Sequence, residues 1–163
     1  MVRTRLTPSS SFIQELTTMP EGRLLENCVV CGMCTARCVV AAGTHYNPRQ
    51  IMQKILVGAR EPVLHSEQPW VCKTCHQCED TCQYGVRLAD VFRVVRSLAV
   101  RENIIPASFR KAANAIFSDG WFMKDAYSDF IADERKELGL SSRLSHNKRY
   151  TRDVRSMYFE EDG

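Results

Sequence analysis

All eight cysteines of this chain lie in two runs that share one spacing. The first run, CVVCGMCTARC, covers residues 28–38, and the second, CKTCHQCEDTC, covers residues 72–82. Each run reads C-x2-C-x2-C-x3-C. Thiolates separated by two residues in a tight loop reach three corners of one small inorganic cube. The spacing therefore predicts cubane [4Fe–4S] clusters.

The fourth cysteine of each run follows a three-residue step and points away from the other three. In two-cluster ferredoxins, the fourth cysteine ligates the other cluster. Because the two runs are identical in spacing, the exchange is reciprocal and predicts two [4Fe–4S] clusters. The predicted ligands of the first cluster are Cys28, Cys31, Cys34 and Cys82, and those of the second are Cys72, Cys75, Cys78 and Cys38.

Structural zinc sites are the alternative use of so many cysteines. Such sites usually take their cysteines as separated C-x2-C pairs on two knuckles. A third cysteine two residues further on is not that pattern, which favours iron over zinc. Val39 and Gln83 follow the fourth cysteines, where bacterial ferredoxins carry proline. Without proline we expect the chain to run on from the cysteine toward a helix.

The residues between the cysteines differ in the two runs. Apolar residues such as Val29 surround the first run, and polar residues such as Lys73 surround the second. A drier environment disfavours the more negative reduced cluster, so we hypothesise that the first cluster has the lower potential. His76 stands where Gly32 stands in the first run. It is either an ordinary surface histidine, a group that couples a proton to reduction, or an alternative ligand.

The rest of the composition limits the classes of function. The net charge of +3 over 163 residues gives no case for a nucleic-acid partner. No apolar stretch approaches the roughly 20 residues that span a bilayer, and no hydrophobic signal region is present. We expect a cytoplasmic protein that is not integral to a membrane and does not form disulfides. No nucleotide-binding or hydrolase motif occurs, so we predict no catalytic residue.

Helices must hold the two runs in place. Residues 9–16 predict a short helix that Ser11 caps, and residues 47–58 predict a helix with Asn47 at its N-cap and Gly58 at its end. Between the first helix and the first run, RLLEN (23–27) reads as a short strand or extended segment. AREPVLHSEQP (59–69) reads as a loop.

Helical spacing resumes after the second run. Residues 86–103 show apolar positions three and four apart, Pro106 precedes a helix that Gly120 closes, and a last helix runs from its cap Ser128 to Gly139. The residues between these two helices, WFMKDAY (121–127), read as a loop. We therefore predict a mainly α protein, with an alpha-helical ferredoxin-like domain around the clusters and flanking helices. Its parts are a lead-in (1–27), the two-cluster domain (28–140) and a polar, basic tail (141–163).

Residues 12–140 resemble the C-type subunit of heterodisulfide reductase. The resemblance lies in CVVCGMCTARC, the helix NPRQIMQKILVG, the segment PWVCKTCHQCEDTCQYGV and the helices from LADVFRVVRSLAVRENIIP to NAIFSDG. The cysteine motif alone is shared with other iron–sulfur subunits, and the helix directly after the second run makes the resemblance more specific. The missing prolines depart from the family pattern.

The resemblance implies an electron-transfer subunit within a larger complex. In that family, the C-type subunit holds two [4Fe–4S] clusters and passes electrons between two partners, an A-type subunit with flavin and clusters and a cysteine-rich B-type subunit. The B-type subunit reduces the disulfide of coenzymes M and B in methanogens, and a related complex of sulfur oxidisers acts on lipoate-bound sulfur. The sequence does not separate these settings, although the arginine bias and the missing prolines lean toward the second.

Two other classes of function stay open. One is a free ferredoxin-like carrier, although such carriers are much smaller and often acidic. This chain continues for about half its length after its last cysteine, Cys82, which suits docking to permanent partners. The other is a structural zinc module.

Overall fold

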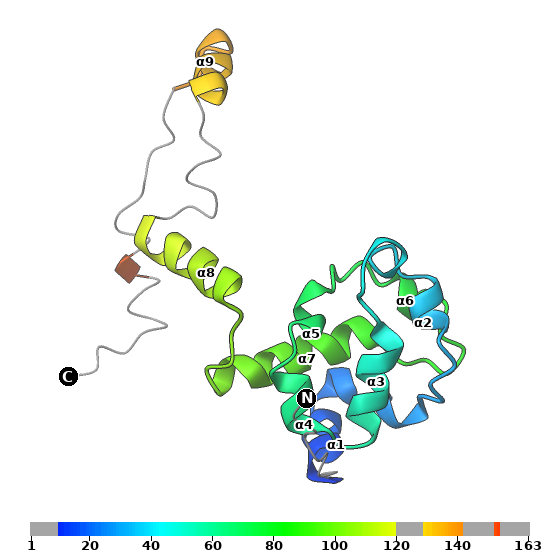
Figure 1. The fold of residues 1–163 in the computed structure, drawn as a ribbon. Coiled ribbons are helices and arrows are strands. Elements are labelled where there is room, and N and C mark those ends of the chain that lie inside the picture. Colours follow the sequence, from blue (N-terminus) through cyan, green and yellow to red (C-terminus); the bar gives the residue numbers. More distant parts are fainter. Residues whose placement is uncertain (1–9, 120–128, 142–151, 154–163) are drawn as a thin grey trace, which may run out of the picture. The chain divides into compact units, whose positions relative to one another are not determined.

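The computed structural model describes residues 10–119, 129–141 and 152–153 (Figure 1). Every regular element in these ranges is a helix, which confirms the mainly α prediction. The chain divides after Ile104 into two compact units. None of the described helices is both long enough and apolar enough to cross a bilayer. The boundaries predicted at residues 27/28 and 140/141 stay predictions.

The first unit carries both cysteine runs. Its α-helices are α1 (Ser10–Thr17), α2 (Met33–Ala36), α3 (Pro48–Leu56), α4 (Arg60–Leu64), α5 (Gln68–Val71), α6 (Gln77–Asp80) and α7 (Leu88–Arg101). Its 3-10 helices are η1 (Pro20–Gly22), η2 (Leu25–Asn27) and η3 (Ala41–Gly43). Helices α2 and α6 each begin two residues after the second cysteine of their run, and they pack against each other (Figure 1).

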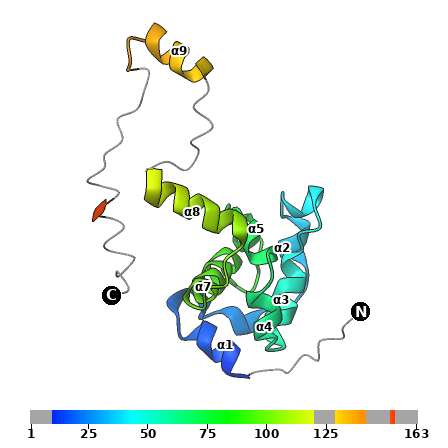
Figure 2. The ribbon, with the colours of Figure 1, turned by 60° about the vertical axis from the view of Figure 1, so that its left-hand side comes forward.

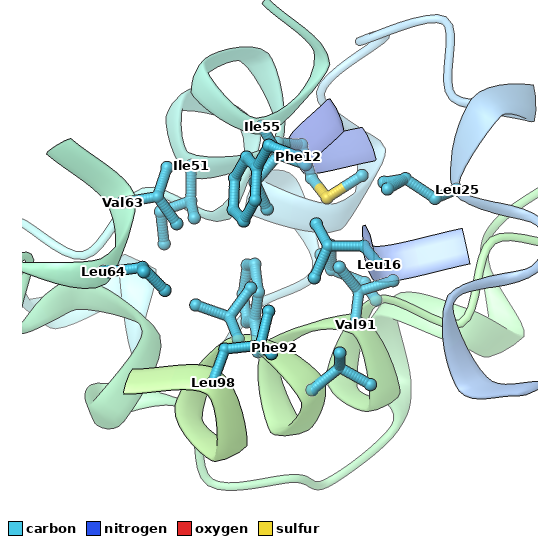
Figure 3. Close-up of a cluster of buried hydrophobic side chains, with 14 of the residues drawn as sticks. Phe12, Leu16, Leu25, Ile51, Ile55, Val63, Leu64, Val91, Phe92 and Leu98 are labelled. Carbon is cyan, nitrogen blue, oxygen red and sulfur yellow. The ribbon is translucent and has the colours of Figure 1, made fainter. Parts of the chain in front are cut away.

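A hydrophobic core behind the cysteine loops fixes the longer helices. Phe12 and Leu16 of α1 have no exposed side-chain surface, nor has Phe92 of α7. Figure 3 shows these side chains meeting Ile55 of α3 and Leu64 of α4. Helix α1 contacts α3 and α7, and α4 contacts the same two helices (Figures 1 and 2). Burial of these apolar surfaces stabilises the scaffold on which the loops rest.

Helix α3 begins and ends where the sequence predicts. The Asn47 side chain accepts a hydrogen bond from the backbone N–H of Gln50 at 3.1 Å, so Asn47 is the N-cap. Pro48 occupies the first turn, where its missing N–H costs nothing. Gly58 has φ 70° directly after the C-cap, a conformation that glycine adopts without steric cost.

Ion pairs hold the ends of α1, α4 and α7 together. The guanidinium of Arg60 lies 3.0 Å from Glu15 Oε2 and also pairs with Glu102. The same guanidinium stands 6.0 Å from the centre of the Phe12 ring. Arg60, at the start of α4, therefore links α1 to the C-terminal end of α7.

Three local predictions were wrong. Helix α1 already includes Ser10, so Ser11 is not its N-cap. The RLLEN segment is not extended: it forms η2, because Leu25 turns into the core and the Cys28 N–H bonds to its carbonyl oxygen at 3.1 Å. The predicted loop at 59–69 contains α4 and the start of α5. Val63 of α4 is buried against residues distant in sequence, and the local sequence does not indicate that burial.

The second unit contains α8 (Ala107–Asp119) and α9 (Asp129–Glu137). Helix α8 follows Pro106, as predicted, and α9 is followed by Gly139 with φ 68°. Arg135 donates from Nε to the carbonyl oxygen of Ser141 at 2.8 Å beyond this end. The predicted cap Ser128, the predicted end at Gly120, the loop 121–127 and most of the predicted tail lie outside the described residues.

Gly22 tests how closely α1 packs on the turn that follows it. A Cβ at Gly22 would overlap the carbonyl oxygen of Leu16 and lie 2.7 Å from its carbonyl carbon. Because backbone cannot give way as a side chain does, we expect Gly22→Ala to cost about 3 kcal/mol. The midpoint of thermal unfolding, followed by circular dichroism, should fall by about 10 °C.

Gly43→Ala is the matched control for this substitution. No atom lies within 4 Å of a Cβ built at Gly43, so the same added methyl group should leave the midpoint nearly unchanged. Equal midpoints for the two variants would contradict the packing described for α1 and η1.

Candidate iron-sulfur centre

All eight cysteines are free thiols, and they line two cavities in the first unit. The cysteines of the first cavity are Cys28, Cys31, Cys34, Cys82 and Cys78. Those of the second are Cys72, Cys75, Cys78, Cys38 and Cys34. The structure thus brings the fourth cysteine of each run to the cavity of the other run. Among the described residues, no three His, Cys, Asp or Glu side chains converge closely enough to hold a single metal ion.

The third cysteines of the two runs form a shared wall between the cavities. Cys34 and Cys78 line both cavities, and so does Leu88 at the start of α7. The contact between α2 and α6 brings these third cysteines together, because Cys34 lies in α2 and Cys78 lies in α6. Two groups bound in these cavities would therefore be immediate neighbours.

The two runs repeat each other in backbone conformation as well as in sequence. Val30 and Thr74, each two residues after the first cysteine, have φ 55° and 52°. Gly32 and His76, each directly after the second cysteine, have φ 91° and 61°. Positive φ is rare for residues other than glycine and is costly for a β-branched valine. Such strain persists where the surroundings require it, as at a ligand-binding loop.

These left-handed residues direct backbone N–H groups at cysteine sulfurs. The Thr74 N–H lies 3.5 Å from Cys72 Sγ, and the equivalent N–H of Val30 bonds to Cys28. The Val86 N–H lies 3.4 Å from Cys82 Sγ. Hydrogen bonds of this kind stabilise thiolate and tune the potential of an iron–sulfur cluster. The donor set of the loops therefore fits such a cluster.

Burial separates the second cysteine of each run from the others. Cys31 and Cys75 are exposed, while the remaining six are half-buried and pack against the core. Each cavity therefore approaches the protein surface at one cysteine. The exposed residues beside Cys31 include Val29 and Met33, whereas Lys73 is exposed beside Cys75.

Burial also controls the protonation of the thiols. Desolvation raises the pKa of Cys28 and of Cys34, and it raises the pKa of Cys78 to about 12. Neighbouring thiolates add to each shift, and Cys82 of the other run is the larger of these for Cys28. In the free chain these thiols hold their protons at neutral pH, so the binding of iron must release them.

The N-terminus of α3 anchors the first cysteine loop. The Thr35 hydroxyl donates to Asn47 Oδ1 at 3.2 Å and accepts from the backbone N–H of Arg49 at 2.9 Å. Arg49 lines the first cavity and donates from Nε to the carbonyl oxygen of Val30 at 2.9 Å. Neither Thr35 nor Arg49 stood out in the sequence, because their partners lie 12 or more residues away.

Tyr46 was also missed by the sequence analysis. It is 4% exposed and lines the second cavity together with Cys72, whose sulfur lies close enough to the phenol to act on it. Burial, followed by the nearby Cys72, raises the pKa of its phenol well above the usual range. Nothing in the sequence around a tyrosine that directly precedes a helix N-cap indicates that its side chain lines a cavity.

His76 lines the second cavity from an exposed position. Its Nδ1 lies 3.0 Å from Glu79 Oε2, and the other oxygen of Glu79 accepts from the Ala89 N–H at 3.1 Å. This arrangement holds the imidazole toward Glu79, and the role of His76 stays open. Neither fourth cysteine continues directly into an α-helix: Cys38 is followed by a turn and η3, and Cys82 by a turn that ends at Gly85.

The anchor at Thr35 has a measurable consequence. Thr35→Val keeps the shape of the side chain and removes both hydrogen bonds at the start of α3, together with the hydroxyl's contact with Cys34, at a cost of about 1–3 kcal/mol. We expect the brown iron–sulfur absorbance to bleach faster in a chelator under anaerobic conditions. Thr17→Val is the control, because that hydroxyl donates to Gln14 within its own helix. Equal bleaching rates in the two variants would show that the anchor does not hold the loop.

Comparison with known proteins identifies the cysteine region. Residues 24–86 match the model of the 4Fe-4S dicluster domain. Over 146 residues the chain is 30% identical to the C-type iron-sulfur subunit of the CoB–CoM heterodisulfide reductase of Methanopyrus kandleri, which covers 85% of this chain and 75% of that protein.

Other relatives carry related names. The chain is 29% identical over 119 residues to the C-type subunit of the H(2):CoB-CoM heterodisulfide,ferredoxin reductase of Methanothermobacter thermautotrophicus, covering 73% of this chain and 63% of that protein. It is 40% identical over 85 residues to the C-type subunit of the ferredoxin:CoB-CoM heterodisulfide reductase of Methanosarcina acetivorans, covering 52% of this chain and 34% of that protein. The chain thus spans less than two thirds of these two relatives. With its [4Fe–4S] dicluster domain, it belongs to the family of C-type subunits of heterodisulfide reductase.

Proposed function

We propose that this chain is an electron-transfer subunit that holds two [4Fe–4S] clusters, one in each cavity. The observation that carries the proposal is the lining of the cavities, where each run meets the fourth cysteine of the other run. The proposed ligands of the first cluster are Cys28, Cys31, Cys34 and Cys82. Those of the second are Cys72, Cys75, Cys78 and Cys38.

The third cysteines need a choice, since each lines both cavities. Cys34 and Cys78 are assigned to the cavity of their own run, because the C-x2-C-x2-C spacing binds three corners of one cube. Cross-run proximity supports the exchange of the fourth cysteines: Cys82 lies close enough to Cys28 to raise its pKa. Tyr46 in turn lies near both Cys72 and Cys38.

The protein's part in the reaction is to hold and insulate the redox centres. When bound, each cluster takes up and gives back one electron. Cys34, Cys78 and Leu88 line both cavities and keep the two sites adjacent. The backbone N–H groups of Thr74 and Val86 donate toward the thiolates and offset their negative charge. Exposed Cys31 and Cys75 give each site its own route to the surface.

Two partners fit this arrangement. The surface beside Cys31 is apolar, with Val29 and Met33 exposed, while the surface beside Cys75 is polar. Surfaces that differ in this way suit two different proteins. By analogy with the family, we propose an A-type flavin and iron–sulfur subunit on one side and a B-type cysteine-rich subunit on the other. The complex would be a heterodisulfide reductase or a reductase-like complex of the cytoplasm.

A free carrier is the second candidate function. It would hold the same clusters and dock transiently. The length of the chain beyond Cys82, and the described helices α8 and α9 within it, favour the permanent subunit.

Pairs of cysteine substitutions test the ligand exchange. In the exchanged arrangement, Cys28→Ala with Cys82→Ala removes two ligands of one cluster, so about four irons per chain should remain. Cys28→Ala with Cys38→Ala removes one ligand from each cluster, so both should be lost or degraded. Iron and acid-labile sulfide assays on anaerobically purified protein give the result. If each run instead ligated its own cluster, the two variants would behave the opposite way.

Co-purification tests the subunit proposal. An affinity tag on this chain, expressed in its own host and purified without oxygen, should retain a flavoprotein and a second cysteine-rich protein. The untagged strain is the control. If the loaded chain elutes alone, it is a free carrier, and the proposed complex is wrong while the cluster assignment stands.

A further inference from the structure

The two cavities differ in the buried polar groups that face them. Among the polar residues that line the second cavity, Lys73, His76 and Gln77 are exposed, and Tyr46 is buried. The polar side chains that line the first cavity, Arg49 and Tyr84, are both exposed. The second cavity thus has a buried phenol in its lining, whereas the hydroxyl that contacts Cys34, on the wall between the cavities, belongs to the half-buried Thr35.

Contacts on both sides hold Tyr46 in place. Its backbone N–H donates to the Thr44 hydroxyl at 3.1 Å. The next residue, Asn47, caps α3 and donates its N–H to Gln68 Oε1 at 3.1 Å. Gln68 begins α5, the helix that leads directly to Cys72. The phenol and the sulfur that it contacts are therefore fixed to each other through α3 and α5.

The chemistry of the contact sets its direction. Tyr46 and Cys72 line the same cavity, and a thiolate only accepts, so a hydrogen bond between the two is one that the hydroxyl donates to Cys72 Sγ. Reduction adds one negative charge to a cluster, and a donated hydrogen bond stabilises the more negative form more strongly. Such a bond therefore raises the midpoint potential.

We infer that Tyr46 is a positioning residue for electron transfer, which hydrogen-bonds to the Cys72 thiolate and raises the potential of the second cluster. The inference rests on the proposed function, since it needs a cluster in that cavity. It agrees with the expectation that the first cluster has the lower potential. Arg49 lines the first cavity, and its positive charge stabilises a reduced cluster there. It therefore raises the potential of the first cluster and reduces the difference between the two potentials. Tyr46 therefore raises the potential of its own cluster, whichever of the two potentials is lower.

Tyr46→Phe tests this directly, because it removes the hydroxyl and keeps the ring. The full-length chain is titrated anaerobically with a reductant and followed by electron paramagnetic resonance. One midpoint potential should shift downward and the other should stay unchanged. Tyr84→Phe is the matched control: it removes a hydroxyl at the first cavity and should not move the midpoint that Tyr46→Phe lowers.

A second readout separates hydrogen bonding from packing. Electron–nuclear double resonance on samples in H2O and D2O should detect exchangeable protons coupled to the reduced cluster, and Tyr46→Phe should remove one coupling while that of the Thr74 N–H remains. If both clusters load in the variant and neither the midpoints nor the coupling change, the inference is wrong. If the unsubstituted chain binds no iron, the proposed function fails instead.

Should Tyr46→Phe lose the second cluster, fluorotyrosine decides the matter. Incorporation of 3-fluorotyrosine makes the phenol of Tyr46 a stronger hydrogen-bond donor without removing it. The Tyr84→Phe chain is used so that Tyr46 is, among the described residues, the one tyrosine lining either cavity. An upward shift of one midpoint supports the inference. No shift in either midpoint overturns it.

Discussion

The structure depends on keeping eight cysteine sulfurs close together, six of them half-buried against the core. Burial and mutual repulsion both oppose ionisation, as the raised pKa values of Cys28, Cys34 and Cys78 indicate. Positive charge from iron relieves that repulsion, so binding of the clusters and folding of the loops stabilise each other. The helical core supplies the rest: six half-buried cysteines rest on it, and Phe12 and Phe92 fill its centre.

The internal repeat gives the two cysteine runs the same backbone conformation. Val30 and Thr74 take left-handed conformations at equivalent places and aim N–H groups at the first sulfur of each run. The short helices α2 and α6 then bring the third cysteines together. The two halves differ in their surroundings, and those differences distinguish the sites: Arg49 reaches the first cavity and Tyr46 the second.

Sequence predicted those features that depend on local chemistry. Asn47 caps α3 through the N–H of Gln50, three residues away, and the cysteine spacing marks the cluster loops. Features set by distant contacts were missed. Helix α4 has only five residues, too few for a periodic signal, and the pairing of Arg60 with Glu15 and Glu102 helps fix it. The places of Thr35, Arg49 and Tyr46 follow from how α3 packs against the loops, which no spacing records.

The proposed function requires two cubane clusters side by side in one chain. Electron paramagnetic resonance of the fully reduced protein, with iron and sulfide measured on the same sample, tests it most directly. We expect about eight irons and eight sulfides per chain, and a broadened spectrum from two magnetically interacting clusters. A single uncoupled signal with about four irons, or bound zinc with no labile sulfide, would contradict it.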